Sequence, residues 1–165
     1  MISTPRILFV CTGNIFRSLT AEYALRHALR RLPDERAHQI VVESAGTEDY
    51  PHVVAPMVGE YLLSKGLDVR AHRRRTLTAQ MLAPPTRVIA MSTEHCAALR
   101  EQFDYRDAPL FSVACGLPEA PLPDVDEAVA DHYNDPEGTR AHVHATIDRI
   151  IAWTPGLVQR LLADR

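Results

Sequence analysis

A chain of 165 residues with 46% hydrophobic and 24% charged side chains has the composition of one globular domain, residues 1–165, with room for a hydrophobic core. The formal net charge of −3 excludes a general nucleic-acid binder. No apolar run reaches membrane-spanning length, and residues 1–6 lack a signal-peptide pattern. We therefore expect a cytoplasmic protein without nucleic-acid or membrane partners, in which the three cysteines stay reduced.

Short apolar runs alternate with helical patterns along the chain. The runs have the length and β-branched content of buried parallel strands, and they cover residues 6–10, 40–43, 87–91 and 109–113. Between and after them, apolar residues recur at helical spacing in residues 21–32, 57–66, 93–103 and 143–151, with the last helix re-started at Thr154-Pro155. This order predicts an α/β fold, a doubly wound four-stranded parallel sheet with helices on both faces.

The segment that joins the first strand to the first helix has the features of a phosphate-binding loop. The strand stops at Cys11, Gly13 permits a tight turn, and a helix begins near Ser18. Ligands bind at the carboxyl ends of strands in such sheets, and a helix N-terminus attracts anions. The expected phosphate donors are the backbone N–H groups of Thr12, Gly13, Asn14, Ile15, Phe16, Arg17 and Ser18.

Three side chains of this loop suit phosphoryl transfer. A helix N-terminus and a nearby cation can lower a thiol pKa from near 8.5 to about 3.5–7.5, which would make Cys11 a nucleophile. Arg17 can offer two parallel N–H donors to two phosphoryl oxygens. Ser18 can donate its hydroxyl hydrogen to the sulfur and so help the thiolate leave in a second step.

Residues 10–18 resemble the loop of the low-molecular-weight protein tyrosine phosphatases, which reads Val-Cys-x-Gly-Asn-x-x-Arg-Ser and lies near the N-terminus. The resemblance covers most of residues 5–115. It continues in Glu43-Ser44-Ala45-Gly46-Thr47, in Gly66-Leu67-Asp68, in His72-Arg73 where the family has His-x-Ala, and in Met91 with His95.

The resemblance implies roles for residues outside the loop. In the family, an asparagine inside the loop is held in an unusual backbone conformation by a serine and a histidine, which correspond here to Asn14, Ser44 and His72. Tyr50 corresponds to the aromatic wall of the active-site cleft and is the candidate to stack on a phosphotyrosine ring. The triplet Arg73-Arg74-Arg75 is interpreted as a solvated face; if His72 points inward, the triplet instead lies near the mouth of the site and could attract acidic phosphorylated substrates.

The general acid departs from the family pattern of Asp-Pro followed by aromatic residues. Asp124 fits by its distance from the last strand and by the preceding Pro123, and it is preferred. Asp135-Pro136 restores the dipeptide, yet it equally fits the N-cap and first turn of the final helix. The acid has to lie close to the bound phosphate, whose negative charge favours a protonated carboxyl.

The leading hypothesis is a cysteine-dependent phosphomonoesterase of the tyrosine phosphatase type, which forms a phosphocysteine intermediate. Its expected substrates are phosphotyrosine proteins or small aryl phosphates, inorganic phosphate is the product, and no cofactor or metal is required. Phe16 stands in the loop where many family members place a second cysteine. A thiol-coupled arsenate reductase and a catalytically weak phosphate-binding module are the alternatives.

Overall fold

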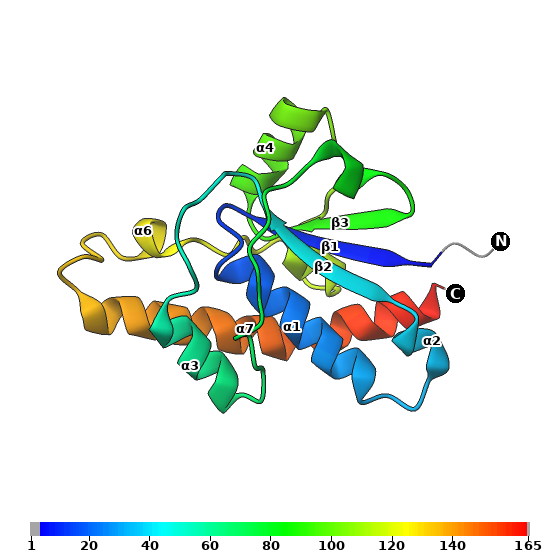
Figure 1. The fold of residues 1–165 in the computed structure, drawn as a ribbon, viewed down its shortest axis with the longest axis horizontal. Helices are drawn as coiled ribbons and strands as arrows, with labels where there is room; N and C mark the ends of the chain where they lie inside the picture. Colours follow the sequence, from blue (N-terminus) through cyan, green and yellow to red (C-terminus); the bar gives the residue numbers. More distant parts are fainter. Residues whose placement is uncertain (1–3, 165) are drawn as a thin grey trace.

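Three parallel strands in the order β2-β1-β3 form the central sheet of the computed structural model, which describes residues 4–164. Strand β1 (Arg6–Cys11) lies between β2 (Val41–Gly46) and β3 (Thr86–Ala90) and pairs with both (Figure 1). Cys11 is opposite Gly46 in the β1–β2 register. The carboxyl ends of the three strands therefore meet at one edge of the sheet, where the loop after β1 begins.

Alternate side chains of β1 enter two separate hydrophobic cores. Ile7, Phe9 and Cys11 point to a core shared with helices α1 (Arg17–Arg30), α3 (Pro56–Ser64) and α7 (Pro136–Ala163). Leu8 and Val10 point to the opposite core, which is covered by α4 (Thr93–Phe103) and the 3₁₀ helix η1 (Ala79–Leu82). A strand has a side-chain period of two, so these two cores confirm a parallel sheet covered by helices on both faces.

Helix boundaries follow local capping signals. The capping box at the start of α4 pairs the Ser92 side chain with the N3 backbone and the His95 side chain with the Ser92 backbone. Helix α3 starts with a proline in its first turn, and Gly66 with φ +83° follows its end. The helices expected over residues 57–66 and 93–103 are confirmed. Two short helices, α2 (Glu35–His38) and α6 (Val125–Ala128), lie in connecting segments.

The expected fourth strand over residues 109–113 is wrong. Leu110 alone forms a bridge with Ala90, and helix α5 (Phe111–Ala114) begins at the next residue. The helical turn brings the Phe111 ring edge-on to Phe9, with ring centroids 5.8 Å apart, under the middle of the sheet. Burial of the Phe111 ring therefore favours a helical turn over the strand that the apolar pattern of residues 109–113 predicts.

Helix α7 is continuous over 28 residues, so the expected re-start at Thr154-Pro155 is also wrong. Pro155 lies inside the helix, and the Thr154 hydroxyl donates to the Ile150 carbonyl at 2.7 Å. The helix packs along α1 and is tied into the core by its buried residues. Within residues 4–164, neither α7 nor any other helix is long and apolar enough to cross a membrane.

Candidate active site

The loop after β1 carries the nucleophile candidate and opens directly onto the start of α1. Cys11 is the last residue of β1 and is 2% exposed, and α1 begins at Arg17 without a side-chain cap at Phe16. In the described residues, no backbone N–H of residues 12–16 donates to a protein acceptor. These groups and the first turn of α1 are available to an anion.

Asn14 fixes the shape of this loop and the direction of its hydrogen bonds. Its φ of 58° is a left-handed conformation, and the Arg75 backbone N–H donates to its Oδ1 at 2.9 Å. Its Nδ2 therefore faces and donates to the hydroxyls of Ser44 at 2.7 Å and Ser18 at 3.0 Å. Since Ser18 accepts from Asn14, its own hydrogen is free to point at Cys11 Sγ, 2.9 Å away.

Two further side chains anchor Asn14. The Ser44 hydroxyl donates to the buried Glu22 carboxylate, which pairs with Arg26 at 2.7 Å. His72 Nε2 donates to the Asn14 carbonyl at 2.9 Å, and burial lowers the pKa of this imidazole from its ordinary value. The positions expected for Ser44 and His72 thus surround the loop asparagine. The sequence interpretation did not identify Glu22, because it lies among the apolar positions of α1 and its spacing does not indicate that it contacts Ser44.

Arg17 is 1% exposed and is held from several sides. One terminal nitrogen donates to the Leu122 carbonyl at 2.8 Å and to Glu94 at 3.2 Å. The other donates to Asp124 Oδ2 at 2.8 Å and to the Thr12 hydroxyl at 3.5 Å. The guanidinium is therefore fixed at the floor of the site before any ligand arrives.

The two acid candidates lie in different surroundings. Asp124 lines the same cleft as Cys11 and Arg17, and its Oδ1 accepts from the Val125 N–H at 2.8 Å as the cap of α6. Asp135 caps α7 through the Gly138 N–H at 2.8 Å and does not line this cleft in the described structure. The structure places Asp124, but not Asp135, in the cleft that Cys11 lines.

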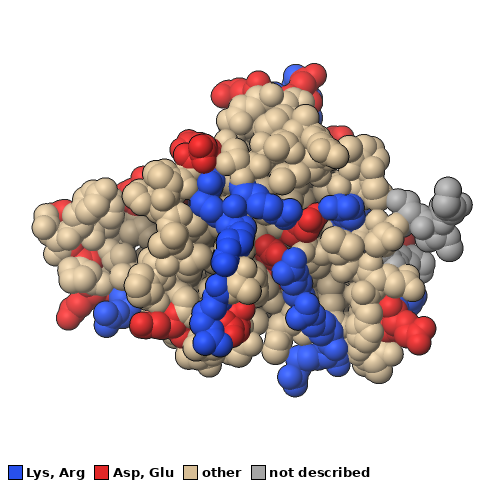
Figure 2. All heavy atoms as spheres, in the orientation of Figure 1, with Lys and Arg blue, Asp and Glu red and all other residues tan. Residues whose placement is uncertain are grey.

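Two of the three consecutive arginines do not form the solvated face that was expected. Arg74 donates to the Gly13 carbonyl at 3.0 Å and to the Glu48 carbonyl at 2.8 Å, so it ties the Tyr50 segment to the phosphate loop. Arg75 is half-buried, and of the three only Arg73 is exposed. Figure 2 shows the cationic side chains in two bands, over α1 and over the segment after α3. Within the triplet, Arg74 has a structural role, because it supplies the donor for the Gly13 carbonyl of the loop.

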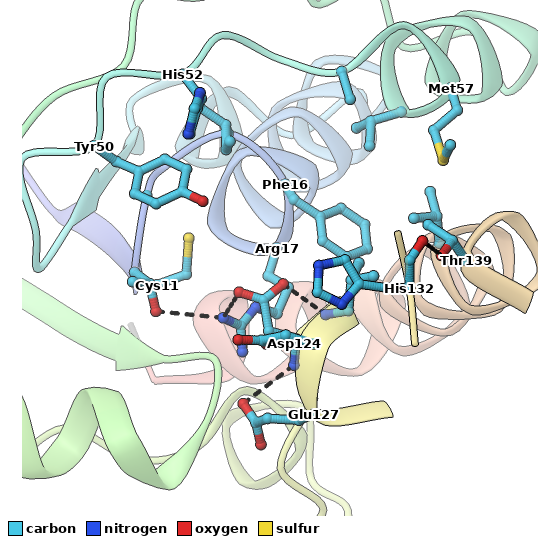
Figure 3. A pocket seen from close by; sticks show the side chains of 18 of the residues that line it. Cys11, Phe16, Arg17, Tyr50, His52, Met57, Asp124, Glu127, His132 and Thr139 are labelled. Atoms are coloured by element: carbon cyan, nitrogen blue, oxygen red, sulfur yellow. Dashed lines mark hydrogen bonds and ion pairs between the residues drawn. The ribbon is translucent and has the colours of Figure 1, made fainter. Parts of the chain in front are cut away.

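Tyr50 lies directly against the phosphate loop. A Cβ placed on Gly13 would meet the Tyr50 ring at 3.0 Å, and the ring stands edge-on to His52 with centroids 4.6 Å apart. In Figure 3, Cys11 lies directly below Tyr50, and His132 lies farther along the same cleft. The Tyr50 ring is therefore placed to cover a planar group bound beside the thiol.

His95 is a member of the site that the sequence interpretation did not assign. The Ser92 N–H donates to its Nδ1 at 3.0 Å, so the imidazole proton is on Nε2, which faces the Thr12 hydroxyl at 3.0 Å. Burial and the Arg17 charge lower the pKa of His95 to about 3. The neutral imidazole thus joins the start of α4 to the phosphate loop. In the sequence, the position of His95 three residues after Ser92 is typical of a capping box and could have indicated this contact.

We expect the stability of this protein to fall in mild acid because of His95. With a pKa of about 3 in the folded protein, the His95 imidazole binds fewer protons there than it does in the unfolded chain at pH values below ~6.5. The free energy of unfolding should therefore fall by about 1.4 kcal/mol per pH unit below that point. Urea unfolding at about pH 7.5 and about pH 5.5 should show a loss roughly 1.4 kcal/mol larger for wild type than for His95→Gln, which can keep the helix cap. Equal losses would contradict this assignment.

Position 46 requires a glycine because the backbone of the phosphate loop passes close to it. A Cβ at this position would lie 2.5 Å from the Thr12 carbonyl oxygen and 3.1 Å from the Asn14 nitrogen, and backbone atoms cannot move aside cheaply. Gly46→Ala should displace the loop and lower kcat/KM by about 10²-fold, since catalysis is sensitive to shifts near 1 Å. Gly59→Ala is the matched control, because its Cβ would meet only Val54 at 3.9 Å. Equal kcat/KM for both variants would show that the approach is not critical.

The other two cysteines are poorly suited to nucleophilic chemistry. Burial raises the pKa of Cys115 to about 12 and also raises that of Cys96. All three thiols are free in the described structure. Within residues 4–164, no group of three or more His, Cys, Asp or Glu side chains is arranged to hold a metal ion.

The fold and this site together define an α/β domain with a thiol at the mouth of an anion-binding loop and a buried arginine behind it. The family model described as low molecular weight phosphotyrosine protein phosphatase matches residues 6–164, and the chain belongs to this family. The alternatives of an arsenate reductase and of a binding module are not favoured by this match.

Individual relatives agree with the family assignment. The Etp low molecular weight protein-tyrosine-phosphatase of Escherichia coli K12 is 36% identical over 92 residues, which are 55% of this chain. The matched segment spans 57% of the length of that relative. A YwlE arginine phosphatase mutant with a phosphorylated active-site serine is 26% identical with a TM-score of 0.76, over 97% of both chains. A tyrosine phosphatase from T. tengcongensis is 26% identical with a TM-score of 0.72, over 94% and 98% of the two chains.

Proposed function

We propose that this protein is a cysteine-dependent phosphotyrosine phosphatase. The observation that carries the proposal is the presence of Cys11, Arg17 and Asp124 in one cleft at the start of α1. The reduced state of the three cysteines suits the cytoplasm, where we place the enzyme. We also propose that residues 1–165 form one domain.

In the first step, the Cys11 thiolate attacks phosphorus in line with the bond to the leaving oxygen. The S–P bond forms, the P–O bond breaks, and Asp124 gives its proton to the departing oxygen. Arg17 and the loop N–H groups hold the equatorial oxygens, where negative charge is spread in the transition state. The phosphate competes with Asp124 for the same Arg17 nitrogen, so its binding releases the carboxyl group next to the leaving group.

In the second step, water attacks the phosphocysteine and Asp124 takes its proton. The S–P bond breaks, inorganic phosphate forms, and the electron pair returns to Cys11 as a thiolate. The Ser18 hydroxyl is directed at this sulfur because its oxygen already accepts from Asn14. A hydrogen bond to the charged form of the thiol stabilises it as a leaving group.

A phenol, such as the tyrosine side chain, is the leaving group that the cleft favours. Tyr50 packs on Gly13 of the loop, so its ring can stack on the ring of an aryl phosphate bound there. The relative named as an arginine phosphatase makes phosphoarginine a second candidate. Glu48 and Asp126 also line the cleft, and such carboxylates would attract a guanidinium group.

A substrate panel tests the proposal. Purified enzyme is given para-nitrophenyl phosphate and matched peptides that carry phosphotyrosine or phosphoarginine. We expect kcat/KM at least about tenfold higher for the phosphotyrosine peptide than for the phosphoarginine peptide. A reversed preference would establish the arginine phosphatase, whereas phosphate binding without turnover would contradict the proposal.

A further inference from the structure

The catalytic cleft continues well beyond the phosphate site. A single cavity of about 880 Å³ reaches from Cys11 to the residues of α3 and α7. Cavities of roughly 300–1,000 Å³ enclose whole drug-sized ligands, so this volume exceeds what one phosphorylated side chain requires. In Figure 3, Phe16 lies between Cys11 at one end of the cleft and Met57 at the other. The cleft therefore extends past the Phe16 ring, and this far part is called the second compartment.

The chemistry of the second compartment differs from that of the first. The phosphate end carries a thiol, a guanidinium and a carboxylate, whereas Phe16, Met57, Val58 and Val143 supply apolar side chains to the same lining. Figure 3 shows Thr139 next to Met57 at the far end. Phe16 and Val143 are 8% and 2% exposed and are built into the core. The floor of this compartment is therefore fixed rather than formed by loose surface residues.

The rims of the cleft are apolar and exposed. Val53 and Tyr133 are 82% and 88% exposed, the highest values among the exposed large hydrophobic residues of the described structure, and both line this same cleft. Exposed apolar side chains cost free energy in water and, where they gather, mark binding surfaces. Their position at one cleft indicates that an apolar group covers them in the working complex.

We propose that the compartment formed by Phe16, Val53, Met57, Val58, Tyr133 and Val143, called the apolar annex, binds a bulky apolar side chain of the phosphorylated peptide itself. The annex and the phosphate site are parts of one cavity, so one peptide can fill both with two nearby side chains. This inference rests on the proposed phosphatase function and adds the class of substrate: phosphotyrosine peptides with a large aliphatic residue within two positions of the phosphotyrosine.

The test compares peptides that differ only at the neighbouring residue. For each position within two residues of phosphotyrosine, a leucine peptide and a serine peptide are assayed, with para-nitrophenyl phosphate as the common reference. Removal of a leucine side chain from water favours binding, whereas a serine side chain gains little, so at one position the leucine peptide should have a kcat/KM at least about tenfold higher.

Variants of the annex should remove this preference. Val53→Ser acts on the exposed rim and Met57→Gln on the wall, and each should bring the leucine-to-serine ratio toward one. Leu63→Gln is the matched control, because Leu63 is 50% exposed on the same helix α3 and lies outside the cleft lining. The control should keep the wild-type ratio.

The outcomes separate the annex from the function on which it rests. Turnover of para-nitrophenyl phosphate with equal rates for leucine and serine peptides at every position would overturn the annex and leave the phosphatase intact. A ratio that falls as much in Leu63→Gln as in Met57→Gln would also overturn it. No turnover of any phosphate ester would overturn the phosphatase and the annex together.

Discussion

Replacement of Cys11 by serine is expected to lower kcat for para-nitrophenyl phosphate by roughly 10⁴-fold or more, as loss of a covalent nucleophile usually does. A serine hydroxyl is a far weaker acid than a thiol and is not ionised near neutral pH. The neighbouring Ser18 hydroxyl cannot act as its base, because this group serves as a donor to residue 11. Steady-state kinetics of the purified variant measure the loss.

The variant should still bind inorganic phosphate, because Arg17 and the loop N–H groups are unchanged. Calorimetric titration with phosphate therefore separates loss of chemistry from loss of the fold. Cys96→Ser is the matched control: the Cys96 thiol is half-buried, has a raised pKa and does not line the cleft. Residual activity of Cys11→Ser near that of Cys96→Ser would refute a covalent mechanism at Cys11.

The parts of the site that are contiguous in sequence were predictable. A strand, a tight loop and a helix follow one another within a few residues, so their contacts are local and Cys11, Arg17 and Ser18 take positions that the spacing dictates. Ser44 and His72 came from the family resemblance. The two faces of the sheet also followed from side-chain alternation, since Leu8 and Phe9 enter different cores.

The parts that depend on distant contacts were not predictable from local pattern. Residues 109–113 are apolar enough for a strand, but the Phe111 ring fills the core beside Phe9 only from a helical turn. Arg74 resembled a surface charge until its target, the Gly13 carbonyl, was known. Gly46 matters because the loop after β1 crosses over it, and no sequence period records this contact between the loop and the end of β2.

Replacement of Asp124 by asparagine should have opposite effects on turnover and on phosphate binding. Without a proton donor for the leaving oxygen, kcat should fall by about 10²–10⁴-fold, the usual contribution of general acid catalysis. The same substitution removes the carboxylate that occupies Arg17 at 2.8 Å. Since one terminal nitrogen of the guanidinium then loses its carboxylate partner and one carboxylate fewer repels the anion, inorganic phosphate should inhibit the variant at lower concentration than it inhibits wild type.

This pair of results distinguishes a general acid from a residue that only stabilises the loop. A merely structural defect would weaken phosphate binding and turnover together, because both need the same loop geometry. Asp135→Asn is the control: Asp135 is the cap of α7 and lies outside the cleft lining, so its loss should cost about 1 kcal/mol of stability or less with no change in phosphate inhibition. Leaving-group dependence gives a further check, since a good leaving group such as para-nitrophenol needs less protonation than tyrosine. The kcat defect of Asp124→Asn should therefore be larger for phosphotyrosine peptides than for para-nitrophenyl phosphate, and an equal defect for both would assign the proton transfer to another group.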